Sequence, residues 1–144
     1  RSGLWNAGLD YGHGTGHGVG AFLNVHEGPQ RISPVAHDVA LQVGMVLSNE
    51  PGYYEKNWGG IRLENLYLVK NSDKFPQHPD GKDWLHFEEL TLIPFDRKLV
   101  DRNLLSEKEL QWLDKYHVRV FSEISPMLDN PEDFQWLTWA CGID

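Results

Sequence analysis

The sequence predicts an α+β domain in which strands come first and helices follow. Short apolar runs bounded by glycine and proline fill the first two thirds of the chain, and a helical pattern with a capping box begins only at Ser106. The strand candidates lie in short succession, which favours a mostly antiparallel sheet. We expect a sheet-rich part at residues 1–94 and a helical tail at residues 95–144.

Composition and charge narrow the class of protein. The 144 residues are 40% hydrophobic and 24% charged, which is typical of a globular domain or a large part of one. The formal charge is −8 and the basic residues are scattered, so no nucleic-acid partner is expected. No apolar run approaches the roughly 18 residues of a membrane span, and the N-terminus has no signal-peptide pattern. We therefore expect no membrane association.

The single cysteine and the first residue suggest where the protein is found and whether the sequence is a fragment. Cys141 has no second cysteine for an internal disulfide, so a reducing, cytoplasmic setting is the default. Its thiol is expected to be inert and to lie near a surface or interface. The chain begins with Arg1 rather than methionine and is expected to be a piece of a longer protein.

The first half of the chain contains three predicted elements. Residues 1–10 have the loose apolar spacing of a helix end. Residues 21–25 form a short apolar run that closes at a turn cluster, which indicates a strand entering a loop. Residues 45–49 stop at Pro51-Gly52, so they predict a buried strand that ends in a tight turn.

Two more strands are expected before the helices. Residues 59–69, GGIRLENLYLV, predict one strand, and four of its residues share one face because strand side chains alternate. These four residues are Arg62, Glu64, Leu66 and Leu68. A polar loop spans residues 71–83, and the last strand spans residues 87–93 and stops before Pro94.

The C-terminal part predicts two helices. Ser106 and Glu109 form a capping box, and apolar residues then recur at helical spacing until the helix stops before Pro126. Asn130, followed by Pro131 as the first helical residue, begins a second and shorter helix. Three tryptophans of these helices are expected in the core rather than at a subunit interface, namely Trp112, Trp136 and Trp139.

Residues 12–20, GHGTGHGVG, hold two histidines among five glycines. A nucleotide-binding loop of this composition would have to open a helix, but Gly28-Pro29 soon follows. A helix that places both histidines on one metal ion is also disfavoured, because each glycine costs about 1 kcal/mol relative to alanine. The stretch is therefore expected to be extended or looped.

The spacing of the two histidines predicts separate tasks. In an extended segment His13 and His17 lie on one face but about 13 Å apart, which is too far for one ion with bonds of ~2 Å. One of them is a candidate metal ligand, and the glycines would let a ligand or another strand come close. A glycine-rich turn with two surface histidines is the alternative.

Two glutamates at strand positions are further candidate ligands. Glu50 precedes Pro51-Gly52, and Glu64 lies inside an apolar strand, where glutamate is unusual unless it is paired or binds a metal. A salt bridge between Arg62 and Glu64 would be the structural explanation. One histidine with two glutamates would instead form an oxygen-rich site that suits Mn, Co, Fe or Zn in a hydrolytic centre.

Three sequence blocks resemble a known family. The runs DYGHGTGHGVGAFLNVHEGP, SNEPGYY and GIRLENLYLV, and the tail with WLDKYH, are similar to the C-terminal half of the catalytic domain of Xaa-Pro aminopeptidases of the long, eukaryotic type. These enzymes are pita-bread metallopeptidases, so the resemblance implies a partial pita-bread fold with a curved sheet and C-terminal helices. It also implies a homodimer, and hydrolysis of peptides with proline at the second position by a water held between two divalent metal ions.

By position, the resemblance implies a metal-binding set that is incomplete in this chain. His17, Glu50 and Glu64 match three ligands of a dinuclear centre, with manganese expected first and cobalt, zinc or iron as alternatives. Glu50 also matches the general base. Two aspartate ligands would lie upstream of the histidines, where this chain offers only Asp10, which does not match a ligand position. The isolated fragment is therefore expected to hold metal partly or not at all and to be inactive.

The resemblance places three further residues around the substrate. His13 and His26 match catalytic and substrate-binding histidines that hold the peptide and stabilise the tetrahedral intermediate. Arg62 matches an arginine that orients the site and contacts the substrate region. Two alternatives stay open, a prolidase-type dipeptidase and a pita-bread module that binds without catalysis.

Overall fold

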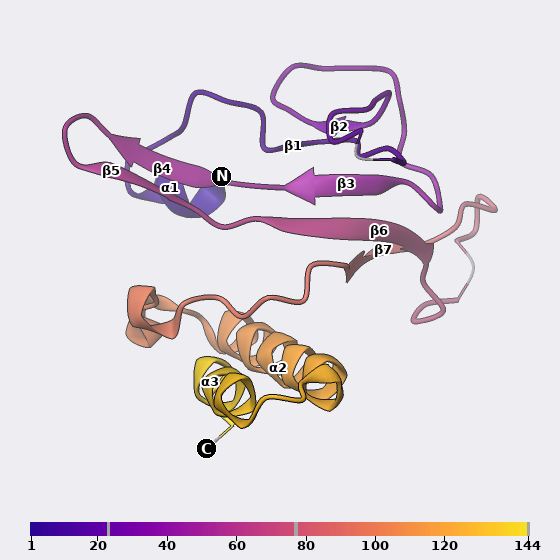
Figure 1. The fold of residues 1–144 in the computed structure, drawn as a ribbon. Coiled ribbons are helices and arrows are strands. Elements are labelled where there is room, and N and C mark those ends of the chain that lie inside the picture. The colour runs from indigo at the N-terminus through magenta and orange to yellow at the C-terminus, as the bar shows by residue number, and fades with distance from the viewer. Residues whose placement is uncertain (23, 77, 144) are drawn as a thin grey trace. The chain divides into compact units, whose positions relative to one another are not determined.

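The computed structural model describes residues 1–22, 24–76 and 78–143. The chain divides into two compact units, Arg1–Thr91 and Leu92–Asp144. The first unit contains the strands and a short N-terminal helix, α1 (Ser2–Asn6), and the second contains two longer helices (Figure 1). The predicted α+β class, with a helix end near the N-terminus, is confirmed.

The central sheet of the first unit has three strands within the described residues. They are β3 (Val46–Asn49), β6 (Asn65–Asn71) and β7 (Leu85–Glu89), and β6 lies in the middle and pairs antiparallel with both neighbours. The side chains of Leu47 and Val69 are almost fully buried in this sheet. The predicted antiparallel pairing and the buried strand near residues 45–49 are therefore confirmed.

Two smaller antiparallel pairs complete the described part of the first unit. The strands β1 (Gly16–His17) and β2 (Arg31–Ile32) form one pair. The strands β4 (Gly52–Glu55) and β5 (Gly59–Arg62) form a hairpin. The hairpin turn contains Asn57 with a positive φ of 68°, a conformation that asparagine tolerates better than most residues.

Several predictions for the first unit need correction. Residues 21–25 do not form a strand in their described part, because the chain turns back on itself: the amide of Asn24 donates to the carbonyl of Ala21, and Phe22 has a positive φ of 52°. Leu23 lies outside the described residues. The expected tight turn at Pro51-Gly52 is also wrong, because Gly52 begins β4.

The predicted strand at residues 59–69 is two strands, β5 and β6, separated by Leu63 and Glu64. The chain breaks there because it leaves the hairpin with β4 and joins β3. The last strand begins two residues earlier than predicted, since Leu85 pairs with Asn71. Its predicted end at residue 93 is wrong, because β7 stops at Glu89 and only the amide of Leu90 still donates, to the carbonyl of Leu66.

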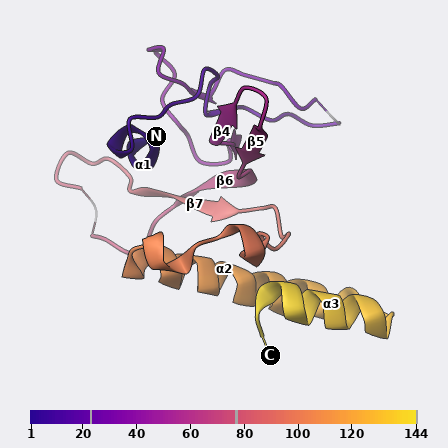
Figure 2. The same cartoon turned by 90° about the vertical axis from the view of Figure 1, so that its left-hand side faces the viewer.

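The second unit is built around the helices α2 (Glu107–Ile124) and α3 (Pro131–Cys141), with short 3-10 turns beside them. The capping box of Ser106 and Glu109 and the N-cap of Asn130 are present as predicted. α3 lies alongside α2 in both views (Figures 1 and 2). Of the helices in the described ranges, none combines the length and apolar character that crossing a membrane requires.

The core of the second unit contains Tyr116, Val120, Leu137 and Cys141. Cys141 is 5% exposed, so its predicted position near a surface is wrong, and burial raises the pKa of its thiol. The three tryptophans expected in the core are partly exposed instead, at 43–56% of their surface. These are Trp112, Trp136 and Trp139.

Candidate functional site

The glycine-rich stretch lets the chain's own backbone come close to β1. A Cβ added at Gly16 would lie 1.9 Å from the carbonyl oxygen of Ser48, and one added at Gly18 would lie 2.0 Å from the carbonyl oxygen of Glu27. Thr15 accepts a hydrogen bond from the amide of Glu50 at 2.7 Å. The glycines therefore bring the residues around His17 against the end of β3, as the option of a close strand predicted.

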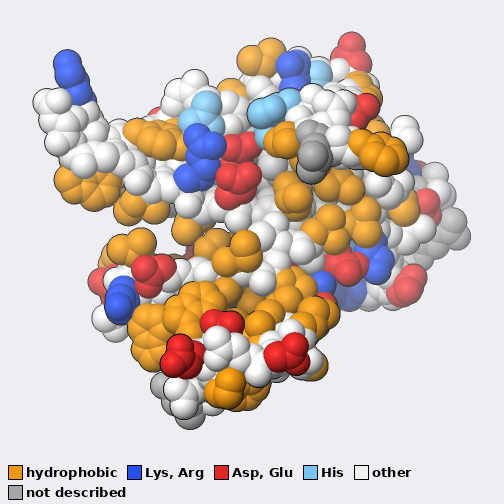
Figure 3. Space-filling model, in the orientation of Figure 1, with side chains coloured by type: hydrophobic (Ala, Val, Ile, Leu, Met, Phe, Trp, Pro, Cys, Tyr) orange, Lys and Arg blue, Asp and Glu red, His pale blue; other side chains and the backbone are white. Residues whose placement is uncertain are grey.

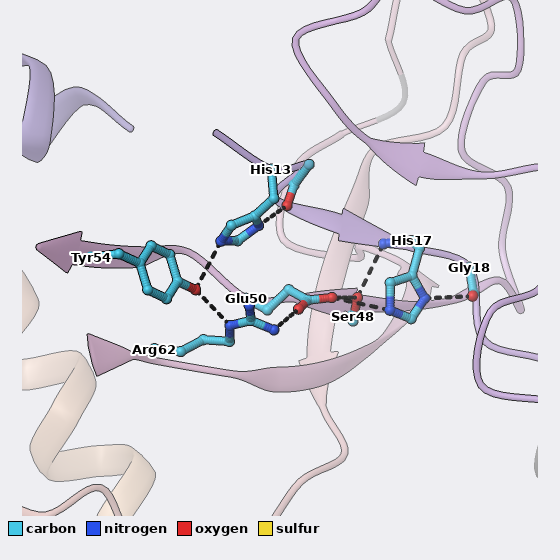
Figure 4. Close-up of polar contacts among 8 residues, drawn as sticks. His13, His17, Gly18, Ser48, Glu50, Tyr54 and Arg62 are labelled. Atoms are coloured by element: carbon cyan, nitrogen blue, oxygen red, sulfur yellow. Dashed lines mark hydrogen bonds and ion pairs between the residues drawn. The ribbon is translucent and has the colours of Figure 1, made fainter. Parts of the chain in front are cut away.

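Glu50 is a mostly buried carboxylate at the end of β3, 8% exposed. Arg62 Nη1 donates to its Oε2 at 2.8 Å, and Ser48 Oγ donates to its Oε1 at 3.0 Å. His17 Nε2 lies 3.0 Å from the same Oε1 (Figure 4). Both carboxylate oxygens of Glu50 thus accept a hydrogen bond, and Oε1 also faces the ring of His17.

The ring of His17 is oriented by its other nitrogen. Nδ1 lies 2.9 Å from the carbonyl oxygen of Gly18, which can only accept, so Nδ1 carries the proton. In the neutral ring Nε2 then presents a lone pair to Glu50 Oε1, and two acceptors at 3.0 Å require a proton or a cation between them. An imidazole nitrogen and a carboxylate oxygen that face each other in this way could act as two ligands of one metal ion.

A second chain of hydrogen bonds runs from Glu50 to His13. Arg62 Nε donates to the hydroxyl of Tyr54 at 2.8 Å, and that hydroxyl lies 2.9 Å from His13 Nε2. His13 Nδ1 is 2.6 Å from the carbonyl oxygen of Gly14, so it donates there and Nε2 accepts from Tyr54. The hydrogen bond to Tyr54, with the charge of Glu50, raises the pKa of Arg62. His13 and His17 lie at opposite ends of this network (Figure 4).

His26 and Glu64 both lie near His17. The ring centroid of His26 is 4.2 Å from that of His17. Glu64 is exposed and its charge contributes to raising the pKa of Arg62. A cavity of about 420 Å³ is lined by Glu64 and His17 together with Val19, Val25, Ser48, Leu66 and Thr91. Histidine, acidic and basic side chains gather on one face of this unit (Figure 3).

The fit to a metal centre is partial. Within residues 1–22, 24–76 and 78–143, no three side chains of histidine, cysteine, aspartate or glutamate are placed as a ready metal site. Two ligands that meet at right angles on one ion with bonds of about 2.1 Å lie about 3.0 Å apart, as His17 Nε2 and Glu50 Oε1 do. The pair fits neighbouring ligands of one ion, and Glu64 lies at the same cavity as His17.

Two residues of the network have no role in the sequence prediction, Ser48 and Tyr54. The two glycines of the hairpin, Gly52 and Gly60, could have pointed to Tyr54, because its ring lies against them. A Cβ at either glycine would lie 2.4 Å from a Tyr54 atom. For Ser48 the sequence offers only a polar residue in an apolar strand.

A larger cavity of about 700 Å³ lies in the second unit and contains none of the predicted site residues, so it is not the candidate site.

Two family models match the chain. One describes metallopeptidase family M24 and matches residues 1–71, and the other describes the C-terminal region of peptidase M24 and matches residues 83–142. The first match contains the whole network, from His13 to Arg62, and also Glu64.

Two relatives are similar over nearly the whole chain. Aminopeptidase P2 from Arabidopsis thaliana is 52% identical over 138 residues, which are 95% of this chain and 19% of that protein. Xaa-Pro aminopeptidase 1 from Dictyostelium discoideum is 43% identical over 141 residues, which are 96% of this chain and 22% of that protein. The chain thus spans about a fifth of the length of these relatives.

The fold is also that of a solved structure. The X-prolyl aminopeptidase of Caenorhabditis elegans, a cytosolic enzyme with a di-nuclear active site, matches with a TM-score of 0.87 and 41% sequence identity. The match covers 98% of this chain and 23% of that one. This likeness confirms the predicted partial pita-bread fold.

Proposed function

Because this chain belongs to metallopeptidase family M24, we propose that it is the C-terminal half of the catalytic domain of an aminopeptidase. The reaction is hydrolysis of the peptide bond between an N-terminal residue and a following proline. The observation that carries the proposal is the directed network from His13 through Tyr54, Arg62 and Glu50 to His17. This network holds His17 Nε2 against the carboxylate of Glu50, and it holds His13 at its other end.

In this proposal the divalent metal ions are held by His17, Glu50 and Glu64. Further ligands come from parts of the full-length protein that this sequence does not include. The contact between His17 and Glu50 and the position of Glu64 at the same cavity support it. The C. elegans relative has a di-nuclear active site, which supports two ions. Two carboxylates and one imidazole form a hard ligand set, which favours manganese, with cobalt, zinc and iron as alternatives.

Each residue of the network has a task in the reaction. Metal ions in such centres supply activation of a water and polarisation of the scissile carbonyl. Glu50 takes the proton that the attacking water loses and passes it to the leaving proline nitrogen, while Arg62 holds its second oxygen in place. His26 donates to the developing oxyanion. His13 binds the peptide, with its ring fixed by Tyr54.

The proposed partners are peptides with proline at the second position and a second copy of the full-length protein. Partly exposed aromatic side chains on α2 and α3 support a subunit interface, namely Trp112, Phe134, Trp136 and Trp139. The C. elegans relative is a cytosolic enzyme, which supports a cytoplasmic location.

The test uses the full-length protein that contains this chain. It is stripped of metal with a chelator, reloaded with Mn²⁺ and assayed with an Xaa-Pro-Xaa tripeptide and an Xaa-Pro dipeptide. We expect metal-dependent release of the first residue from the tripeptide. Cleavage of the dipeptide alone would indicate a prolidase-type dipeptidase instead, and metal binding without cleavage of either peptide would indicate a non-catalytic module.

A further inference from the structure

Ser48 is a buried polar residue on β3 for which the sequence suggests no task. Its exposed fraction is 0%, the same as that of its apolar neighbour Leu47. A hydroxyl removed from water costs free energy unless it is hydrogen-bonded, and a β-branched or apolar residue would suit this strand position better. The serine therefore calls for polar partners inside the protein.

Two hydrogen bonds place the Ser48 hydroxyl between the two candidate ligands. The backbone amide of His17 lies 3.0 Å from Ser48 Oγ, and Oγ lies 3.0 Å from Glu50 Oε1. Because an amide can only donate, Oγ accepts from His17, and its single hydrogen is left for Glu50. One hydroxyl thus fixes the backbone of one ligand and the side chain of the other.

Backbone packing brings these groups together. Ser48 and Glu50 are two residues apart in an extended chain, so their side chains point to the same side. Gly16 lets β1 approach, since a Cβ there would lie 1.9 Å from the Ser48 carbonyl oxygen. The next residue is His17, whose amide therefore reaches the Ser48 hydroxyl (Figure 4).

We propose that Ser48 is a positioning residue whose hydroxyl holds Glu50 Oε1 opposite His17 Nε2 and thereby prepares this pair for a divalent ion. The inference rests on the proposed function of the site. Without the hydroxyl, Arg62 still holds Oε2, but the carboxylate can rotate and carry Oε1 away from His17. The separation of 3.0 Å between Nε2 and Oε1 is then no longer fixed.

The test compares Ser48→Ala with Ser48→Thr in the full-length protein. Threonine keeps the hydroxyl, and Ser48 is among the residues that line the cavity of about 420 Å³. Ser122→Ala is the matched control, because it removes a serine hydroxyl from an exposed position on α2. Calorimetric titration of the metal-free proteins measures the affinity for Mn²⁺, and the melting temperature of each metal-free protein is recorded beside it.

We expect Ser48→Ala to bind Mn²⁺ about 10–100-fold more weakly than the wild type, as when other groups that orient metal ligands are lost. Ser48→Thr is expected to recover most of this affinity, and Ser122→Ala to match the wild type. Unchanged affinity in Ser48→Ala overturns the proposal, and so does an equal loss in the alanine and threonine variants, since packing would then explain it. If Mn²⁺ affinity depends on Ser48 but the wild type cleaves no Xaa-Pro peptide, the proposed function fails and this inference stands.

Discussion

Tyr54 joins two side chains that are far apart in the sequence. Its hydroxyl accepts from Arg62 Nε and donates to His13 Nε2, and Arg62 also holds Glu50. One phenol therefore connects the histidine proposed to bind the peptide with the carboxylate proposed to move the proton. Because a hydroxyl has one hydrogen, both bonds can be satisfied only in this direction.

Replacing Tyr54 by phenylalanine keeps the ring and removes the hydroxyl. We expect kcat/KM of the full-length protein for an Xaa-Pro-Xaa tripeptide to fall about 10–100-fold, because a hydrogen bond to a charged group is worth about 1.5–3 kcal/mol. Tyr53→Phe is the control, since Tyr53 contacts Trp58 through its ring. Equal kcat/KM for the two variants would exclude Tyr54 from the working network.

The candidate ligands and Arg62, which holds Glu50, could be predicted from the sequence, but Ser48 and Tyr54 could not. Histidine among glycines and glutamate in apolar runs are unusual enough to indicate a site, and the structure brings His17 and Glu50 together, although both glutamates lie just beyond strand ends rather than inside strands. Ser48 and Tyr54 act through bonds to residues 31 and 41 positions away. Such contacts depend on which strands pair, and no local pattern reports that.

At the scale of elements, the position of β1 depends on glycines rather than on its length of two residues. Gly16 and Gly18 admit the carbonyl groups of Ser48 and Glu27 at distances that any side chain would prevent. The amide of Glu50 also donates to the carbonyl of Thr15. The strand that carries His17 is thus attached to β3 by close backbone packing together with hydrogen bonds on either side of it.

Gly16→Ala should displace β1 from β3. The added Cβ would lie 1.9 Å from the Ser48 carbonyl oxygen, and overpacking of this kind costs about 1–3 kcal/mol. Gly12→Ala is the control in the same stretch, because a Cβ there meets nothing within 4 Å. We expect a lower melting temperature and weaker Mn²⁺ binding for Gly16→Ala in the full-length protein. A variant as stable and as tightly metal-binding as Gly12→Ala would contradict this account of β1.

A buried histidine attaches α2 to the segment before it. His117 is 3% exposed, its Nε2 accepts from the amide of Phe95 at 3.1 Å, and the neighbouring Tyr116 donates to the carbonyl of Ile93. Burial, with the charge of Arg97, lowers the pKa of the His117 imidazole. Protonation of Nε2 would remove the acceptor for Phe95.

The lowered pKa of His117 predicts acid-sensitive docking of this segment. The unfolded segment binds more protons than the folded one below the ordinary histidine pKa of about 6.5, so the stabilisation is full above that pH and declines as the pH falls. Hydrogen exchange of peptides covering residues 92–117, corrected for the intrinsic rate, should show less protection at about pH 5.5 than at about pH 7.5. His117→Gln should remove this dependence, while His86→Gln on exposed β7 should retain it. Equal pH dependence in both variants would contradict the prediction.

The helices were easier to predict than the strands for a physical reason. A helix closes its hydrogen bonds within its own sequence, so the capping box at Ser106 and the N-cap at Asn130 fix its ends locally. The strand run at residues 59–69 breaks because its two parts pair with different partners, β4 and β3. The apolar run at residues 21–25 resembles a strand in composition, but its described residues fold back in a turn.

At the scale of the whole molecule, the chain contains part of a larger protein's proposed active site. It spans about a fifth of the length of its relatives, and the described residues assemble no metal site of three or more ligands. His17 and Glu50 meet and Glu64 lines the same cavity as His17, while the other ligands in the proposal belong to parts of the full-length protein that this sequence does not include.

The isolated 144 residues are therefore expected to be inactive. Purified fragment with Mn²⁺ should release no product from an Xaa-Pro-Xaa tripeptide, because one contacting histidine and carboxylate cannot complete a dinuclear centre. The full-length protein under the same conditions is the positive control. Robust turnover by the fragment would show that the site is complete without the further ligands.

The central claim is that His17 and Glu50 are metal ligands of an Xaa-Pro aminopeptidase. The most direct measurement is the metal content and tripeptide turnover of full-length His17→Ala, beside the exposed control His86→Ala. The account predicts that His17→Ala loses bound Mn²⁺ and its metal-dependent turnover, while His86→Ala keeps both. Wild-type metal content and turnover in His17→Ala would contradict it.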